Sequence, residues 1–270
     1  MRNDDSRTDI MDGDEKKTDL PAERLNKSFR SYIFSRQRDL ILELVAPQSG
    51  ERVLVVGGNA GDYLTIFREK WCLVAGFVSS AQNPQSVRKE REVSVDLQAG
   101  NPEDLPFSDD EFDVVAVINT LETARDPQKA VAEAVRICRG RIFIGFLNKY
   151  SVAGTQHSMK ELLGFSPEEK IRLFSIDEIK GMASSIIGAQ DFNWGSVIYF
   201  PAVVYDISTE LEELVPHRKN PLGAFAGLTF PVKYTYRTVQ NPVLESYEIK
   251  ADTQVTAPGA LHGTLREAGK

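Results

Sequence analysis

The sequence predicts an α/β fold in which a mostly parallel sheet is covered by helices on both faces. From residue 52 onward, short apolar runs alternate with amphipathic stretches at helical spacing, and this order is typical of parallel strands joined by right-handed crossovers. The run at residues 53–56 is rich in valine, which suits a strand that is buried on both faces.

Five strands are expected in the first part of the chain, at residues 53–56, 72–78, 92–97, 112–118 and 141–147. Helices are expected between them at residues 63–70 and 85–90. A further helix begins after Asp126, which suits an N-cap, with Pro127 at the first helical position. Its apolar face is expected to carry Val131, Ala134, Val135 and Cys138 at helical spacing.

The segments on either side of this core are also periodic. Residues 23–45 predict one or two helices that end before Pro47. Ser175 and Glu178 form a capping-box pattern that opens a helix, and Gly188 is a suitable stop. The remaining expectations are a loop or lid at residues 151–169, late strands at 192–200 and 222–239, and a helix at 203–214.

One large domain with two tails is therefore expected. Residues 1–22 and 246–270 are polar and poor in large apolar side chains, so disordered tails are predicted there. The domain spans residues 23–245. It divides into leading helices (23–46), a core (47–148), and a lid with terminal strands (149–245).

The charge and composition of the sequence argue against several classes of function. The net charge of −7 and the pI of about 5.2 offer no basic surface for nucleic acid or for an anionic membrane. The chain shows neither a signal peptide nor an apolar run long enough to cross a bilayer, so a cytoplasmic protein is expected. Cys72 and Cys138 are expected as core residues, and the three histidines lack the spacing of metal ligands.

The segment "VLVVGGNAGDYL" turns sharply from a strand into a helix through residues 57–61. In an open parallel sheet, ligands bind at the carboxyl ends of the strands, where such a turn lies. The spacing is not that of a dinucleotide fingerprint, and no Walker lysine follows. By itself the turn is either a ligand loop or simply a tight connection.

The segment "NPEDLPFSDDEFDVVAVINTLETARDPQKAVAEAVRICRGRIFIGFLN", residues 101–148, distinguishes these alternatives. It resembles the methyltransferase type 11 group of S-adenosylmethionine-dependent methyltransferases. In that group, an acidic residue before Leu-Pro-Phe, a short acidic turn and Phe-Asp introduce the fourth strand, as Asp104 to Asp113 do here. With the glycine turn, the resemblance covers about residues 34–148.

The resemblance implies a Rossmann-like methyltransferase fold with a seven-stranded, mostly parallel sheet whose last strand is antiparallel. It also implies S-adenosylmethionine as cofactor, with the glycine turn against the methionine part. A first set of cofactor-binding positions follows from the resemblance: Gly57, Gly58, Asn59, Gly61 and Asn119.

Three usual acids are missing at the positions that the resemblance assigns to the cofactor. Val55 stands for the first-strand acid and Val78 for the acid that holds the ribose hydroxyls. Ser79 or Ser80 offers only a weaker neutral hydrogen bond there. Asn101, followed by Pro102, replaces the acid beside adenine and keeps an acceptor without the charge. These losses imply that cofactor binding is weakened or lost.

The candidate catalytic residues are not determined by the sequence. Asn119, Thr120 and Glu122 follow the fourth strand, and Asn148, Lys149 and Tyr150 follow the fifth. Glu122 is either a general base or an exposed glutamate at a helix start. Tyr32, Phe34 and Arg36 either cover the pocket or are ordinary packing and surface residues.

Two functions are therefore expected. The first is methyl transfer from S-adenosylmethionine to a small molecule. The second is a non-catalytic methyltransferase-like protein that binds a protein partner or another ligand. Neither function involves nucleic acid, a membrane or a metal.

Overall fold

The computed structural model describes residues 21–57, 60–79, 96–151, 171–188, 191–199, 215 and 218–232. All of them belong to the unit Met1–Tyr234. The helices in this part of the chain are α1 (Pro21–Val45), α2 (Ala60–Arg68), α4 (Pro127–Ile137) and α6 (Ile176–Ile187). The strands are β1 (Arg52–Val56), β2 (Leu73–Ser79), β3 (Asp96–Gly100), β4 (Phe112–Ile118), β5 (Cys138–Leu147), β6 (Asn193–Val197) and β7 (Phe225–Pro231).

The strands form one seven-stranded sheet in the order β3-β2-β1-β4-β5-β7-β6. The pairs among β1 to β5 are parallel, whereas β7 is antiparallel to both of its neighbours. This confirms the expected mostly parallel sheet with an antiparallel last strand. The strand order reverses between β1 and β4, which is where ligands bind in open α/β sheets.

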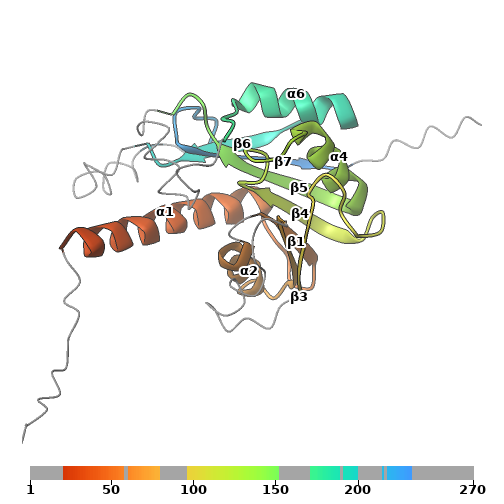
Figure 1. Cartoon of the computed structure of the whole chain (residues 1–270), viewed down its shortest axis with the longest axis horizontal. Coiled ribbons are helices and arrows are strands. Elements are labelled where there is room, and N and C mark those ends of the chain that lie inside the picture. Colours follow the sequence, from red (N-terminus) through yellow and green to blue (C-terminus); the bar gives the residue numbers. More distant parts are fainter. Residues whose placement is uncertain are drawn as a thin grey trace, which may run out of the picture. The chain divides into compact units, whose positions relative to one another are not determined.

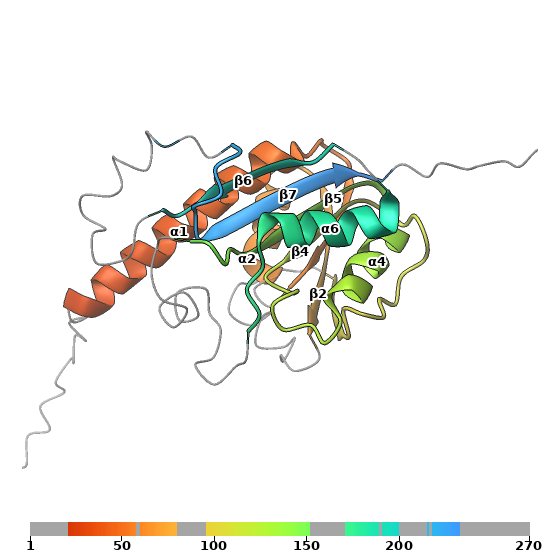
Figure 2. The same cartoon turned by 90° about the horizontal axis from the view of Figure 1, so that it is seen from above.

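Helices cover both faces of the sheet, as predicted (Figures 1 and 2). On one face α1 packs against β5, β6 and β7, and α2 packs against β1 and β2. On the other face α4 packs against β4, β5 and α6. None of the described helices combines the length and apolarity that crossing a bilayer requires.

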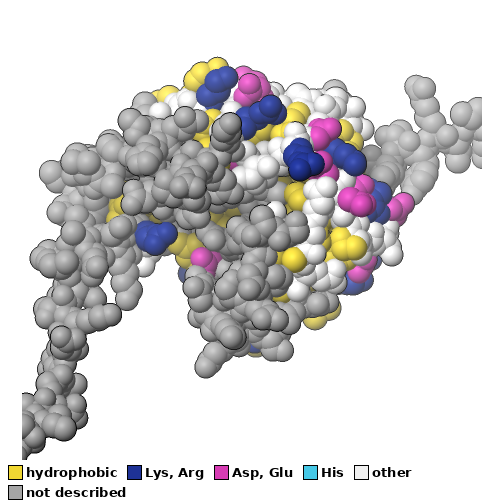
Figure 3. Space-filling view, viewed as in Figure 1, with side chains coloured by type: hydrophobic (Ala, Val, Ile, Leu, Met, Phe, Trp, Pro, Cys, Tyr) yellow, Lys and Arg dark blue, Asp and Glu magenta, His cyan; other side chains and the backbone are white. Residues whose placement is uncertain are grey.

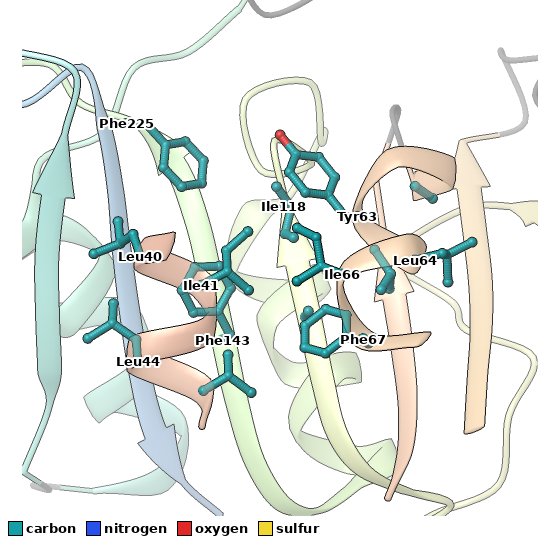
Figure 4. Packing of buried hydrophobic residues seen from close by; sticks show 14 of the residues in the cluster. Leu40, Ile41, Leu44, Tyr63, Leu64, Ile66, Phe67, Ile118, Phe143 and Phe225 are labelled. Carbon is teal, nitrogen blue, oxygen red and sulfur yellow. The ribbon is translucent and has the colours of Figure 1, made fainter. Parts of the chain in front are cut away.

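The core on the α1 and α2 face is built from the inward sides of these two helices (Figure 4). Leu40, Ile41 and Leu44 of α1 and Phe67 of α2 are buried with Phe143 of β5 in one apolar cluster. Each large buried side chain of this kind contributes about 1.5 to 3 kcal/mol relative to an exposed one. The helix-to-sheet packing thereby holds the ends of the central strands in place.

Local signals in the sequence set the helix ends correctly. The Asp126 carboxylate accepts a hydrogen bond from the amide of Lys129 at 3.1 Å, and Pro127 is the first residue of α4. Ser175 and Glu178 form the expected capping box of α6, which ends at Gly188 in a positive-φ conformation. These caps satisfy amide groups that the first helical turn leaves free.

Several boundaries differ from the predictions. Helix α4 ends at Ile137, so Cys138 begins β5 instead of lying on the helix face. Helix α1 is a single helix that begins at Pro21, within the expected tail. Helix α2 begins at Ala60, within the glycine turn at residues 57–61, and β3 runs to Gly100. As a sheet edge, β3 pairs only with β2 and tolerates polar side chains, which weakens its sequence pattern.

Some predictions lie outside the described residues. They are the helix at 85–90, the lid at 151–169 except Ser151, the helix at 203–214, the histidines, and the tails apart from the residues that α1 includes. Cys72 and Cys138 are both buried and free, as expected.

Candidate functional site

The carboxyl ends of the parallel strands β1 to β5 meet at one edge of the sheet. Gly57 follows β1, Asn101 follows β3, and Asn119 follows β4. Thr120 joins two of these ends, because its hydroxyl donates a hydrogen bond of 2.9 Å to the carbonyl of Val56 in β1. The structure thus brings together segments that are far apart in the sequence.

Gly57 is required by close packing between strands. A Cβ atom at this position would lie 2.2 Å from the carbonyl oxygen of Ile118 in β4, far inside van der Waals contact. Its amide donates a 2.9 Å hydrogen bond to Phe77 in β2. Gly61 is buried within α2, whereas Gly58 and Asn59 lie outside the described residues. The contact of the glycine turn with a ligand stays a prediction.

The positions expected to hold the ribose and the amino end of a cofactor are apolar. Val55 and Val78 are each 0% exposed and belong to the apolar cluster beneath α1 and α2. Ser79, the last residue of β2, is half-buried. Neither valine can accept a hydrogen bond, so neither supplies the carboxylate contact expected at these positions.

Asn101 directly follows β3 and starts a loop with fixed geometry. Its side-chain oxygen accepts a 3.0 Å hydrogen bond from the amide of Glu103, and Pro102 between them is half-buried. Arg136 of α4 donates 2.9 Å hydrogen bonds to the carbonyls of Leu105 and Phe107. This guanidinium holds the Leu-Pro-Phe segment against α4 and keeps Asn101 near the edge of the sheet.

Hydrogen bonds between three buried polar side chains link the end of β4 to α1 and α2, the two helices on one face of the sheet. The Tyr63 hydroxyl of α2 donates to the side-chain oxygen of Gln37 in α1 at 3.0 Å. It accepts a longer hydrogen bond, 3.4 Å, from the Asn119 amide nitrogen. Figure 4 shows the Tyr63 hydroxyl pointing away from the apolar cluster. Burial raises the pKa of Tyr63 well above its usual value, and the charge of Glu122 adds to the rise.

Among the three linked side chains of Gln37, Tyr63 and Asn119, two polar atoms have no hydrogen-bond partner within the described structure. They are the side-chain nitrogen of Gln37 and the side-chain oxygen of Asn119. Both residues are buried, and Asn119 adopts a positive φ of 51°, a conformation that asparagine accepts more readily than most residues. Buried polar atoms without partners are costly and mark candidate ligand contacts.

Glu122 is buried, with 2% of its surface exposed, and it lies in a turn after β4. The prediction of an exposed glutamate at a helix start is therefore wrong. One carboxylate oxygen accepts a 2.7 Å hydrogen bond from the amide of Leu147, and the other has no partner. Burial raises the pKa of Glu122 to about 7, although the hydrogen bond from Leu147 opposes the rise. A role as general base stays a hypothesis.

The residues after β5 have structural partners or face solvent. Asn148 is buried, and its side-chain nitrogen donates hydrogen bonds to the carbonyls of Pro221 and Gly223. Lys149 and Tyr150 are exposed. On α1, Phe34 packs its ring against Tyr63 with the ring centroids 5.8 Å apart. Tyr32 and Arg36 are half-buried, and their roles stay open.

Gln37 and Tyr63 did not appear among the candidates from the sequence. One signal was available for Gln37, which is a polar residue on the apolar face that Ile33, Ile41 and Leu44 define. A polar side chain at such a position needs a buried partner. Nothing in the local sequence distinguishes Tyr63 from a core aromatic residue.

Neither a metal-ligand cluster nor a surface of one charge marks a further site among the described residues. No group of three potential metal ligands occurs among them. On the face drawn in Figure 3, basic and acidic side chains lie interspersed over the described surface.

Comparisons with known proteins agree with this architecture. Residues 54–143 match the family model Methyltransf_11, described as a methyltransferase domain. The chain is 31% identical to the demethylmenaquinone methyltransferase of Renibacterium salmoninarum over 104 residues, 38% of this chain and 44% of that protein. It is 33% identical to an uncharacterized protein of Methanocaldococcus jannaschii over 86 residues, 31% of this chain and 41% of that protein. The chain thus spans less than half the length of these two relatives.

Solved structures show the same fold. A possible histamine N-methyltransferase from Thermotoga maritima aligns with a TM-score of 0.57 and 22% identity, over 77% of this chain and 96% of that one. A methyltransferase from Haloferax volcanii, solved with its Trm112 activator, aligns with a TM-score of 0.50 and 16% identity, over 78% and 98% of the two chains. Residues 54–143 are therefore similar to the methyltransferase domains that this family model describes, and the chain has a Rossmann-like methyltransferase fold.

Proposed function

We propose that the protein transfers a methyl group from S-adenosylmethionine to a small molecule. One observation carries the proposal. The family match covers the chain from β1 into β5, and the carboxyl ends of these strands bring Gly57, Asn119 and Glu122 to the edge where this fold binds ligands. The acceptor is a small molecule, and the location is the cytoplasm, as the composition predicts.

The sulfonium of this cofactor supplies an electrophilic methyl group when it is bound. The protein contributes position: it holds the acceptor in line with the methyl group and keeps water out. An acceptor that is already nucleophilic needs no protein acid or base, so this proposal assigns no catalytic residue.

The described residues fit the cofactor unevenly. Asn101 supplies an acceptor toward adenine, and Ser79 supplies one neutral hydroxyl toward the ribose. Val55 and Val78 are buried and apolar where charged acceptors would be needed. Each lost charge-assisted hydrogen bond lowers affinity by about 1.5 to 3 kcal/mol. The proposal therefore includes weak cofactor binding.

A second candidate function follows from the same two valines. With no carboxylate at either position, the fold is retained while its cofactor affinity falls. A protein that binds a partner or another ligand, without catalysis, accounts for this combination. Its distinguishing property is the absence of S-adenosylmethionine binding at any practical concentration.

Calorimetric titration separates the two functions. The full chain is titrated with S-adenosylmethionine and S-adenosylhomocysteine, with ATP as a control nucleotide that lacks the sulfur-linked amino acid. Saturable binding of both sulfur compounds, and not of ATP, supports the methyltransferase. No binding at millimolar ligand contradicts it and favours the non-catalytic protein.

A further inference from the structure

Helix α2 ends in an unusual cap at the edge of the sheet where the parallel strands begin. The amide of Trp71 donates a 3.0 Å hydrogen bond to the carbonyl of Arg68, and the amide of Cys72 donates one of 3.2 Å to the carbonyl of Phe67. These two bonds form a Schellman motif, in which the residue at the position of Trp71 takes a left-handed conformation. Trp71 accordingly has a φ of 61°.

Tryptophan is an unfavourable residue at this position of the cap. Glycine is usual there, because it lacks the Cβ atom that is crowded in the left-handed conformation. Packing of the indole ring against the chain would offset the strain, yet Trp71 is 81% exposed. Its carbonyl accepts a 2.9 Å hydrogen bond from the amide of Gly50, so the backbone is held in place while the side chain faces solvent. Such strained positions are typical of functional sites.

A second large apolar residue lies beside Trp71. Leu73, the first residue of β2, is 64% exposed, whereas Cys72 between them is buried. The amide of Leu73 donates a 2.8 Å hydrogen bond to the carbonyl of Glu51, which fixes the backbone on this side as well. Two exposed apolar side chains on a fixed backbone suit a protein interface, because little ordering entropy is lost on binding. Tryptophan is also among the residue types that most often dominate binding energy.

The unpaired charges around these two residues are basic. Arg68 and Lys70 are both exposed, and neither has a carboxylate partner among the residues that the structure describes. Glu69 between them forms an ion pair of 2.8 Å with Arg38 of α1. A second copy of the chain, related by a two-fold axis through this surface, would bring cations against cations. The charges therefore favour a different protein that carries carboxylates around an apolar pocket.

We propose that Trp71 and Leu73 anchor a protein partner whose surface has an apolar pocket surrounded by Asp and Glu side chains. Trp71 fills the pocket, and Arg68 and Lys70 pair with the carboxylates. This surface precedes β2, whereas Gly57 follows the parallel strand β1, so the two lie at opposite edges of the sheet. A bound partner thus leaves the ligand edge open, and the inference does not depend on methyl transfer.

The first experiment measures stability. Trp71→Gly removes the strain of the cap and the anchor together. The thermal midpoint of the full chain should rise by about 1 to 4 °C, since glycine accepts the left-handed conformation. An unchanged or lower midpoint would show that the tryptophan stabilises its own chain, and this result would overturn the proposal.

The second experiment identifies the partner at the surface itself. The photo-crosslinking residue p-benzoylphenylalanine replaces Leu73 in the full chain, which is produced in the cells from which the sequence comes and then irradiated. Each crosslinked protein is identified by mass spectrometry, purified, and titrated by calorimetry against wild type, Trp71→Gly and Leu73→Ser. Tyr150→Ser is the matched control, because Tyr150 is a 62% exposed aromatic residue that lies beyond the carboxyl end of β5.

A purified partner is expected to bind wild type and Tyr150→Ser alike, and to bind both surface variants at least about tenfold more weakly. Its affinity should also fall as the salt concentration rises, because cations meet carboxylates at the interface. Crosslinks to no protein, or only to a second copy of this chain, overturn the proposal. A partner that binds Trp71→Gly as tightly as wild type overturns it too. The methyltransferase function is tested separately by the cofactor titration.

Discussion

The buried carboxylate of Glu122 accepts a hydrogen bond from the backbone amide of Leu147, with 2.7 Å between oxygen and nitrogen. This bond ties the turn after β4 to the last residue of β5. The carbonyl of Glu122 also accepts a 2.9 Å hydrogen bond from the amide of Arg172. One residue thereby fixes three segments at the edge of the sheet where a ligand would bind.

The first prediction concerns the pH dependence of stability. Because the folded-state pKa of Glu122 is raised from 4.5 to about 7, the folded protein binds this proton more tightly than the unfolded chain. The stabilisation is therefore present at low pH and is lost as the pH rises through 7. The free energy of unfolding of wild type minus that of Glu122→Gln should fall by roughly 2 to 3 kcal/mol between pH 5 and pH 8.

Urea denaturation of both chains at several pH values measures this difference. Glutamine keeps an oxygen that accepts from Leu147 and removes the charge, so the comparison isolates the titration. Parallel stability curves for the two chains across this range would show that Glu122 does not titrate as the burial implies.

The second prediction concerns the end of α1. Arg141 in β5 makes two hydrogen bonds to the Glu51 carboxylate, at 2.7 and 2.8 Å, and another of 2.7 Å to the carbonyl of Val45. Arg141→Lys should lower the free energy of unfolding by about 2 kcal/mol, because an ammonium cannot reproduce the planar fork. The control is Arg38→Lys, whose ion pair with Glu69 is exposed at 42% and 57% and should change stability by less than about 0.5 kcal/mol.

Denaturation at neutral pH gives both values. The pKa of Glu51 is lowered mainly by its hydrogen bond with Arg141. This contribution is therefore present above pH 4.5 and declines as the pH falls through the folded pKa. Equal losses in the two lysine variants would contradict a special role for Arg141.

The third prediction concerns the glycine that follows β1. Gly57→Ala should destabilise the protein by about 1 to 3 kcal/mol or more, since the new Cβ would meet the Ile118 carbonyl at 2.2 Å. Gly181→Ala provides the matched control, because it lies within α6 and nothing surrounds its Cβ position within 4 Å. Alanine should stabilise that helix by about 0.5 to 1 kcal/mol. Thermal or urea unfolding measures both, and a neutral Gly57→Ala would disprove the close approach of β1 and β4.

The fourth prediction tests the placement of the ribose. If Val78 occupies the position of the usual acid, Val78→Asp should bind S-adenosylhomocysteine about 10-fold to 100-fold more tightly, through new charge-assisted hydrogen bonds to the hydroxyls. The ligand-free variant should be less stable than wild type, because Val78 is fully buried and a carboxylate there lacks a partner. Val78→Thr, similar in shape and uncharged, is the control in calorimetry. An unchanged affinity in the aspartate variant would place the ribose elsewhere.

Much of the fold could be predicted because its signals are local. The bounds of β4, residues 112–118, match the prediction at both ends, since an acidic turn precedes the strand and a polar segment follows it. The caps of α4 and α6 were likewise predictable from Asp126, Ser175 and Gly188, because each side chain or φ angle acts within one turn. The edge strand β3 was misplaced because its sequence, DLQAG, has no apolar pattern.

Part of the candidate site could likewise be predicted from local sequence, and part could not. Gly57, Asn101 and Asn119 could be placed from the sequence, because each directly follows a strand and parallel strands end at one edge. The sequence could not show that Gln37 meets Tyr63 across 26 positions, or that Asn119 meets Tyr63 across 56. Such contacts depend on how helices cross the sheet, which no local pattern encodes.

The sequence by itself thus determined the α/β class, the strand that carries the glycine turn and the apolar residues at positions 55 and 78, since these are properties of short stretches. Only the tertiary structure decided that the Glu122 carboxylate accepts a hydrogen bond from the Leu147 amide. It also decided that the side-chain amides of Gln37 and Asn119 both bond to the Tyr63 hydroxyl. Burial and hydrogen-bond partners arise when distant segments exclude water together, so they exist only once the chain has folded.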